Sequence, residues 1–359
     1  MRPLTLEGEF FTYHSFAHFN REIALALLAR GVPVSLRQRG AQMENIVANP
    51  RYQQLLHLPA YPRAYGLVAR HVYPPDFGRP QGQRLAVVLP WEYGFLPVDW
   101  IKPLQSSVDE VWVYSNFVRD IFLRSGIPYN RLHVVPCGVD PDLFNPEAPP
   151  TRLETRRGFR FLYVGGTRAG GRKGFDLLLR AYLEEFSPRE DVCLVVKDFF
   201  YGRSGYLDAV GRDPTKPEVV YLYNEIPAEK MPGIYRACHC LVHPYRTEGF
   251  CLPVAEALAC GIPTITSFWG PVPEYANADM LYFLRGRIRE IDPGMIGGIQ
   301  TVGRPFWFEP SLQQLRELMR HVYNHYGEAK EKARLGSIHI RTYWSWQNAS
   351  EKVAERLNF

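Results

Sequence analysis

The sequence predicts an α/β fold made of two Rossmann-like, doubly wound domains with an interdomain cleft. Two observations carry this prediction. Short apolar runs alternate with helical segments in both halves of the chain, and a proline-rich stretch with little apolar periodicity, 136–151, separates the halves. A length of 359 residues also favours two domains over one. We expect a first domain over 1–143, a second over 144–337, and a C-terminal helix over 338–359 that packs back on the first domain.

In the first half, the elements follow in a regular order. A helix is expected from Ser15 to Arg30, where Gly31 ends it, and Ser115 is placed to cap a second helix over 116–125. Strands are expected over 34–36, 85–89, 111–114 and 133–135. The run at 85–89 is apolar throughout, which is typical of a strand buried on both faces of a parallel sheet.

The second half repeats the alternation. Strands are expected over 159–164, 192–197, 219–222, 240–242 and 264–266. Helices are expected over 175–186, 312–326 and 345–357, together with a short one inside the segment 247–263. In a doubly wound domain, ligands bind at the carboxyl ends of the strands.

Composition narrows the class of protein. Hydrophobic residues make up 46% and charged residues 22%, which is ordinary for a globular protein, and the net charge is only +5. The absence of a basic tail argues against nucleic acid as a partner. The six cysteines lack the spacing of a disulfide framework, and the first residues lack a signal peptide. We therefore expect reduced thiols and a cytoplasmic location.

A glycine-rich loop follows the expected strand 159–164. It contains Gly165, Gly166, Thr167, Arg168, Arg172 and Lys173 and leads into a helix. Glycines there let backbone amides approach phosphate oxygens, and Lys173 adds a full charge. A flexible turn with solvated basic residues explains the loop equally well. The spacing fits neither a Walker A loop nor the dinucleotide fingerprint, which argues against an NTPase and a nicotinamide enzyme.

The segment 247–263 carries the strongest chemical signal. Glu248 lies on a glycine-containing turn, and Glu256 follows eight positions later on a short helix that begins near Pro253. Proline at a helix start loses no hydrogen bond, and the unpaired first amides attract anions or hydroxyls. Two carboxylates beside such a site suit a ligand that carries both hydroxyls and phosphate. That combination is a nucleotide sugar.

These motifs resemble the donor domain of family 4 (group 1) retaining glycosyltransferases of the GT-B fold. The resemblance rests on the loop 165–174, on Glu248 and Glu256 within EGFCLPVAEALACGIP, and on the crossover VPCGVD with FNP. Tyr235-Arg236-Ala237-Cys238, leading into His243-Pro244-Tyr245, is also similar to the family. The resemblance is strong over about 105–330 and faint in the first hundred residues.

The resemblance implies roles for individual residues. Lys173 would contact the donor diphosphate, Glu248 would bind hydroxyls of the donor sugar, and Glu256 would bind the ribose hydroxyls. Donor contacts are implied for Gly165, Gly166, Thr167, Arg168, Arg172, Lys173, Glu248, Gly249, Phe250, Cys251, Leu252 and Glu256. Many members of the family carry arginine at the position of Thr167, so Arg168 or Arg172 is expected to substitute. A helix-surface role for Glu256 is the alternative.

In the first domain, Glu92 is the candidate catalytic residue. It follows the expected strand 85–89, in a region where relatives often carry histidine. Glu92 is placed either to orient an acceptor hydroxyl and take its proton or to serve as an ordinary loop glutamate, and the sequence does not separate the two. His14 and Ser15 are weaker candidates, since a capping role explains Ser15.

Two other patterns suggest metal binding but have simpler explanations. Asp140-Pro141-Asp142 has an Asp-x-Asp form, yet it lies in the proline-rich linker, where a turn is favoured. Cys238, His239, Cys240 and His243 alternate faces if they lie on one strand, so they do not gather four ligands for zinc. No metal and no cofactor is therefore expected.

The expected function is retaining transfer of a hexose from a nucleoside diphosphate sugar to an acceptor hydroxyl, without a metal. The acceptor is a carbohydrate, a lipid-linked molecule or a small molecule, and the resemblance allows peripheral contact with a membrane. Two alternatives stay open: a nucleotide-sugar epimerase of the same fold, and a catalytically silent nucleotide-sugar binding protein.

Overall fold

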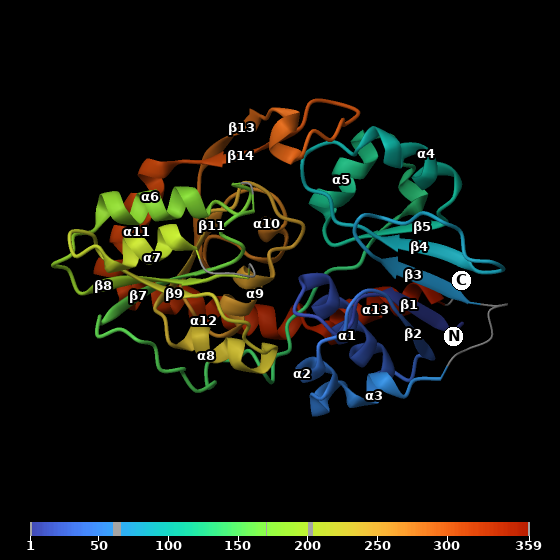
Figure 1. Cartoon of the computed structure of the whole chain (residues 1–359), viewed down its shortest axis with the longest axis horizontal. Helices are drawn as coiled ribbons and strands as arrows, with labels where there is room; N and C mark the ends of the chain where they lie inside the picture. The colour runs from blue at the N-terminus through green and yellow to red at the C-terminus, as the bar shows by residue number, and fades with distance from the viewer. Residues whose placement is uncertain (1, 60–65, 170, 200–203, 358–359) are drawn as a thin grey trace. The chain divides into compact units, whose positions relative to one another are not determined.

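The computed structural model describes residues 2–59, 66–169, 171–199 and 204–357, and the chain divides into two compact units (Figure 1). Unit 1 comprises Met1–Gly138, Gly298–Pro305 and Ser345–Phe359, and unit 2 comprises Val139–Gly297 and Phe306–Trp344. The first crossing between the units therefore falls at 138/139, inside the proline-rich stretch.

Unit 1 contains a six-stranded parallel sheet in the order β2-β1-β3-β4-β5-β6. Its strands are β1 Leu4–Gly8, β2 Val34–Gln38, β3 Leu67–His71, β4 Arg84–Val88, β5 Glu110–Val113 and β6 Leu132–Val134. Its helices are α1 Ser15–Ala29, α2 Glu44–Val47, α3 Gln53–Leu56, α4 Val98–Ser106, α5 Asn116–Arg124 and α13 Trp346–Leu357.

Side chains from the local sequence cap two helices of unit 1, α1 and α5. Ser115 caps α5 as expected, because its hydroxyl accepts a hydrogen bond from the amide of Val118 at 3.3 Å. The capping role assigned to Ser15 is wrong. Ser15 is the first helical residue of α1, and the cap is His14, whose ring accepts from the amide of Phe16.

The end of the chain belongs to unit 1. The expected helix over 338–359 is in fact two helices, since α12 ends at Tyr343 and α13 begins at Trp346. Helix α13 packs against α1, where the Arg30 guanidinium donates to the Ser350 hydroxyl at 2.8 Å.

Unit 2 contains a second six-stranded parallel sheet, in the order β12-β11-β10-β7-β8-β9, and a separate hairpin of β13 and β14. Its strands are β7 Phe159–Val164, β8 Val192–Lys197, β9 Glu218–Leu222, β10 Cys240–His243, β11 Thr264–Ser267, β12 Tyr282–Leu284, β13 Gly286–Glu290 and β14 Phe306–Pro310. Its helices are α6 Phe175–Glu185, α7 Gly205–Arg212, α8 Met231–Arg236, α9 Leu252–Ala259, α10 Val272–Tyr275, α11 Leu312–Asn324 and α12 Tyr326–Tyr343.

Helices cover both faces of the unit 2 sheet. Helices α6 and α11 pack together on one face, and α8, α9 and α12 pack together on the other (Figure 1). Strand β8 is buried along its whole length, which is why its sequence reads as an unbroken apolar run up to Lys197. This arrangement fixes the loops at the carboxyl ends of the central strands.

The strand order of unit 2 is that of a Rossmann domain, and it reverses between β7 and β10. At such a reversal the loops after the two strands run to opposite faces, and ligands bind beside them. The loop after β7 is the glycine-rich loop, and the loop after β10 leads to Glu248. Both predicted donor motifs therefore start at the same edge of one sheet.

Among the helices of the described ranges, none combines the length and the apolar character that crossing a bilayer requires.

Candidate donor site

The glycine-rich loop is attached to its neighbours by backbone contacts. The amide of Gly165 donates to the carbonyl of Lys197 at 3.0 Å, and the amide of Arg246 donates to the carbonyl of Arg172 at 2.8 Å. Gly174 has a φ of +69°, and a Cβ there would lie 1.9 Å from the carbonyl oxygen of Pro244. Only glycine fits this close approach between the loops after β7 and β10. Residue 170 lies outside the described residues.

Lys173 and Glu248, predicted to share a ligand, are bonded directly to each other. The Lys173 ammonium donates to Oε1 of Glu248, and a guanidinium nitrogen of Arg172 lies 3.6 Å from Oε2. Glu248 is only 4% exposed. Burial acts to raise the pKa of Glu248, but Lys173 and then Arg172 outweigh it and hold that pKa below its usual value. Glu248 is therefore ionised at neutral pH, beside two cations.

Arg172 rather than Arg168 is the second cation at this position. Arg172 is half-buried beside Glu248, whereas Arg168 is exposed. Thr167, at the position where the family often has arginine, donates from its amide and its hydroxyl to Asp198, at 3.2 and 2.5 Å. Thr167 thus fixes the turn after β7 through the residue that follows β8.

Helix α9 begins with an unusual backbone conformation. Cys251, which precedes its first residue, has a φ of +69°, the only positive φ of a non-glycine residue in the described part of the chain. Such strain persists where the surroundings hold it, often at functional sites. The Tyr275 hydroxyl holds it here by contacting the carbonyls of Phe250 and Cys251, at 3.2 and 3.1 Å.

Within the described residues no side chain caps α9, and Pro253 is in its first turn. Leu252 is the first residue of this helix, and the Cys251 side chain just before it lies within 4.8 Å of the Glu248 carboxylate. Uncapped amides at a helix start, with the helix dipole, favour an anion. The backbone that leads from Glu248 into α9 therefore consists of Gly249, Phe250, Cys251 and Leu252.

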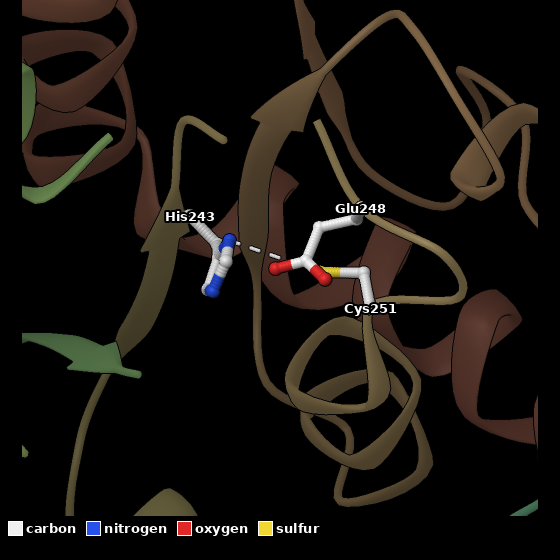
Figure 2. Close-up of side chains that lie close together, drawn as sticks. All are labelled: His243, Glu248 and Cys251. Carbon is white, nitrogen blue, oxygen red and sulfur yellow. Dashed lines mark hydrogen bonds between the residues drawn. The ribbon is translucent and has the colours of Figure 1, made fainter. Parts of the chain in front are cut away.

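His243, Glu248 and Cys251 lie together, and all three are buried (Figure 2). The Cys251 sulfur is 3.7 Å from Nδ1 of His243. Burial lowers the pKa of His243 to about 4, so its ring is neutral at pH 7. One ligand atom from each residue lies within 4.8 Å of the others, which is compatible with a metal. The two cations already on Glu248 oppose binding of another.

Glu256 lies one turn further along α9 and has a different environment. It is half-buried, and its Oε2 accepts a hydrogen bond from the Tyr235 hydroxyl at 2.6 Å. Burial raises the pKa of Glu256 to about 7, against which the Tyr235 bond acts. The two glutamates on this segment therefore differ: Glu248 is paired with cations, and Glu256 is paired with a neutral donor.

Comparisons with known proteins identify the family that part of the chain matches. Residues 158–285 match the family model described as glycosyl transferases group 1. These residues include the glycine-rich loop, Lys173, Glu248 and Glu256. The chain carries a group 1 glycosyltransferase domain.

Two curated relatives show the range of similar proteins. The chain is 31% identical over 188 residues to a GDP-mannose-dependent alpha-(1-6)-phosphatidylinositol monomannoside mannosyltransferase of Mycolicibacterium smegmatis, covering 48% of each chain. It is 32% identical over 164 residues to a D-inositol 3-phosphate glycosyltransferase of Xylanimonas cellulosilytica, covering 42% of this chain and 38% of the relative. The matched parts thus span about half or less of these relatives.

Solved structures extend the likeness to the whole chain. The sucrose-phosphate synthase of Thermosynechococcus elongatus superposes with a TM-score of 0.67 at 16% identity, covering 100% of this chain and 98% of that one. Anabaena Alr3699/HepE, solved in complex with UDP-glucose, superposes with a TM-score of 0.68 at 14% identity and covers 100% of both chains. At these identities the likeness shows the fold, which is GT-B.

Sequence reasoning missed Arg246, a residue that holds the glycine-rich loop in place. Its guanidinium donates to the carbonyl of Gly171 at 2.6 Å and to both carboxylate oxygens of Asp176, at 2.7 and 2.9 Å. It also binds Glu309 on β14 at 3.0 Å, and it is 7% exposed. A buried arginine that joins three segments is a positioning residue for Lys173. Its partners are far away in the sequence, so no local motif marks it.

Glu92 lies where the sequence predicted, in the loop after β4 of unit 1, and is half-buried. The nearby Tyr114 hydroxyl contacts Nε2 of His71 at 2.8 Å, and Nδ1 of the same ring contacts the Asn20 side chain at 2.8 Å. Burial, then Cys137 and then Glu92 raise the pKa of Tyr114. Burial lowers the pKa of His71 to about 3, so this chain of polar groups is neutral.

The patterns that suggested metal ligands have structural explanations. Asp140 accepts hydrogen bonds from the amides of Asp142 and Leu143, at 3.0 and 3.3 Å, which makes the linker segment a turn. Strand β10 begins only at Cys240, so Cys238 and His239 precede it. All six cysteines are free and buried.

Proposed function

We propose that the chain is a retaining, metal-independent hexosyltransferase that uses a nucleoside diphosphate sugar. One observation carries the proposal. At the strand-order reversal of unit 2, a lysine on a glycine-rich loop meets a buried, ionised glutamate at the start of a helix, and a second glutamate follows on that helix. This set offers a cation and amides to a diphosphate, and carboxylates to two sugar rings.

In the proposed reaction the diphosphate is the leaving group. Negative charge grows on it as the bond to the hexose breaks, and Lys173 with the first amides of α9 stabilises that charge. One well-placed donor of this kind contributes roughly 2.7–4 kcal/mol to lowering the barrier. Lys173 is paired with Glu248 in the structure, so binding a donor requires the ammonium to turn from the carboxylate to the phosphate. Glu248 is then released to accept hydroxyls of the hexose.

Several parts of the proposal rest on the family resemblance. Retention of configuration is inferred from it, with the departing phosphate assisting attack on the same face of the sugar. Metal independence is supported by Lys173 and Arg172, which supply the positive charge that a metal would bring. The acceptor is proposed to be a carbohydrate, lipid-linked or small-molecule hydroxyl, because the similar proteins include enzymes named for phosphatidylinositol mannosides and inositol phosphate. Glu92 is proposed to orient the acceptor hydroxyl and to take its proton, and a cytoplasmic location with peripheral membrane contact fits such acceptors.

A thermal-shift screen tests the proposal. Uridine, guanosine, adenosine and cytidine diphosphate sugars are added separately, and one nucleotide class is expected to raise the melting temperature. Slow hydrolysis of the donor without acceptor then indicates a transferase. Isomerised sugar nucleotide would indicate an epimerase, and binding with no turnover would indicate a silent binding protein. Stabilisation by NAD and by none of the sugar nucleotides would refute the proposal.

A further inference from the structure

Tyr235 is completely buried in α8, yet it carries a hydroxyl that a phenylalanine would lack. Its ring packs edge-on against Phe144, with centroids 6.2 Å apart. A buried hydroxyl costs free energy unless it is hydrogen-bonded, and this one donates to Oε2 of Glu256. The packing therefore needs an aromatic ring, but it does not need the oxygen.

The bond leaves most of the Glu256 carboxylate available. In the described residues Oε1 of Glu256 has no hydrogen-bond donor, and Glu256 is half-buried rather than enclosed. A carboxylate has about four lone-pair sites, of which the Tyr235 hydroxyl uses one. The remaining sites suit the two neighbouring hydroxyls of a ribose.

We propose that Tyr235 is a positioning residue that orients the Glu256 carboxylate for the nucleotide ribose. The inference rests on the proposed function, because it deepens the donor site named there. It assigns Tyr235 a role in binding without contact to the ligand. A purely structural tyrosine in the same core would have no such role.

The charges around α9 support this role. Cys251 and Cys260 flank α9 itself. The elements packed against α9 carry Tyr235 and Arg236 on α8, Cys240 and His243 on β10, and Tyr326, Glu328, Lys330, Glu331, Lys332, Arg334, His339, Arg341 and Tyr343 on α12. Strand β11 carries none. The pKa of Glu256, near 7, is raised by burial and lowered by the Tyr235 bond alone, whereas Arg236 and Arg341 act on Cys260. Tyr235 is thus the group that favours the ionised form of Glu256.

The direction of the Tyr235 effect on the pKa of Glu256 predicts how donor binding depends on pH. Ionised Glu256 accepts ribose hydroxyls, so donor affinity nears its maximum about one unit above pH 7 and falls as the pH drops through 7. Removing the Tyr235 hydroxyl raises the pKa of Glu256 further, because a hydrogen bond to the charged form is lost. Near pH 7.5 the Tyr235→Phe variant then has a mostly protonated Glu256 and is expected to bind a donor about tenfold more weakly.

The test is a binding titration with UDP-glucose and GDP-mannose from pH 5.5 to 8.5. Both probes carry their phosphates as diesters, which do not titrate in this range. The variants are Tyr235→Phe, Glu256→Gln and a matched control, Tyr182→Phe. Tyr182 is also completely buried in unit 2, but its hydroxyl donates to the backbone carbonyl of Glu218 at 2.8 Å and not to an acid.

The expected result is a pH profile that moves upward only in Tyr235→Phe. Its affinity should be about tenfold below wild type at pH 7.5 and approach wild type at pH 8.5, while Tyr182→Phe follows wild type and Glu256→Gln binds weakly at every pH. A Tyr235→Phe profile that matches wild type, or a loss that is equal at every pH or shared with Tyr182→Phe, overturns the role of Tyr235. If wild type binds neither probe, the donor site itself is refuted.

Discussion

Because Lys173 pairs with Glu248, removing the charge of Glu248 is expected to affect the binding of a diphosphate and the use of a sugar nucleotide in opposite directions. In the structure the Lys173 ammonium, which is proposed to bind the donor diphosphate, is bonded to the Glu248 carboxylate. A nucleoside diphosphate without a sugar must compete with that carboxylate and gains nothing from releasing it. Replacing Glu248 by glutamine should therefore strengthen binding of the diphosphate and weaken use of the sugar nucleotide.

The size of the effect follows from the pair that is removed. A hydrogen bond to a charged group contributes about 1.5–3 kcal/mol, and every 1.4 kcal/mol is about tenfold in affinity. Lys173 keeps a neutral amide acceptor in the variant, and its side chain is 20% exposed and partly hydrated, so the lower end of the range applies. We expect UDP or GDP to bind the Glu248→Gln variant about tenfold more tightly than wild type.

The assay is isothermal titration at pH 7.5, paired with turnover of the sugar nucleotide. Glu190→Gln is the matched control, because Glu190 also pairs with an arginine of unit 2, Arg320, and the substitution changes the net charge equally. Transfer by Glu248→Gln should fall about 100-fold, since the hexose loses a charged acceptor. Unchanged or weaker binding of the diphosphate in Glu248→Gln would show that Lys173 does not turn from the carboxylate to the phosphate.

Three further outcomes are expected. Lys173→Met should weaken sugar-nucleotide binding about tenfold or more. It should also raise the pKa of Glu248, because Lys173 is the main group that lowers that pKa. Titration of the variant checks both effects, and an unaltered affinity would contradict the role of Lys173 in binding the diphosphate. Gly174→Ala should destabilise the fold by about 3 kcal/mol or more, because it adds a Cβ against the carbonyl of Pro244 at a positive φ, whereas Gly205→Ala, whose Cβ meets no atom, should leave the melting temperature nearly unchanged. Glu256→Gln should stabilise the ligand-free protein above pH 7 by at most about 3 kcal/mol. The pKa of the Glu256 carboxyl is raised from 4.5 to about 7, so this group makes the wild-type fold less stable as the pH rises through that window. Equal unfolding free energies of wild type and variant at pH 8 would argue against this burial.

The sequence predicted the central strands of unit 2 well because they are apolar and short. Strands β7 and β8 have the predicted bounds, and both lie in the middle of a parallel sheet. Strands β1 and β3 of unit 1 went unpredicted because each contains a charged residue. Glu7 and Arg70 are buried and neutralise each other at 3.1 Å, which no local pattern shows.

The candidate site was predictable only where its chemistry lies in local motifs. Lys173, Glu248 and Glu256 belong to the two motifs, and the structure places both motifs at one sheet edge. The pairing of Lys173 with Glu248 joins residues 75 positions apart, so spacing did not reveal it. Arg246 and the pairing of Tyr235 with Glu256 were missed for the same reason, since each contact joins residues on different elements.

A structure of the protein with a bound sugar nucleotide tests the central claim most directly. We predict the diphosphate against Lys173 and the start of α9, the ribose on Glu256, and the Lys173–Glu248 bond broken. A nucleotide bound away from the carboxyl ends of β7 and β10, with that bond intact, would contradict the account.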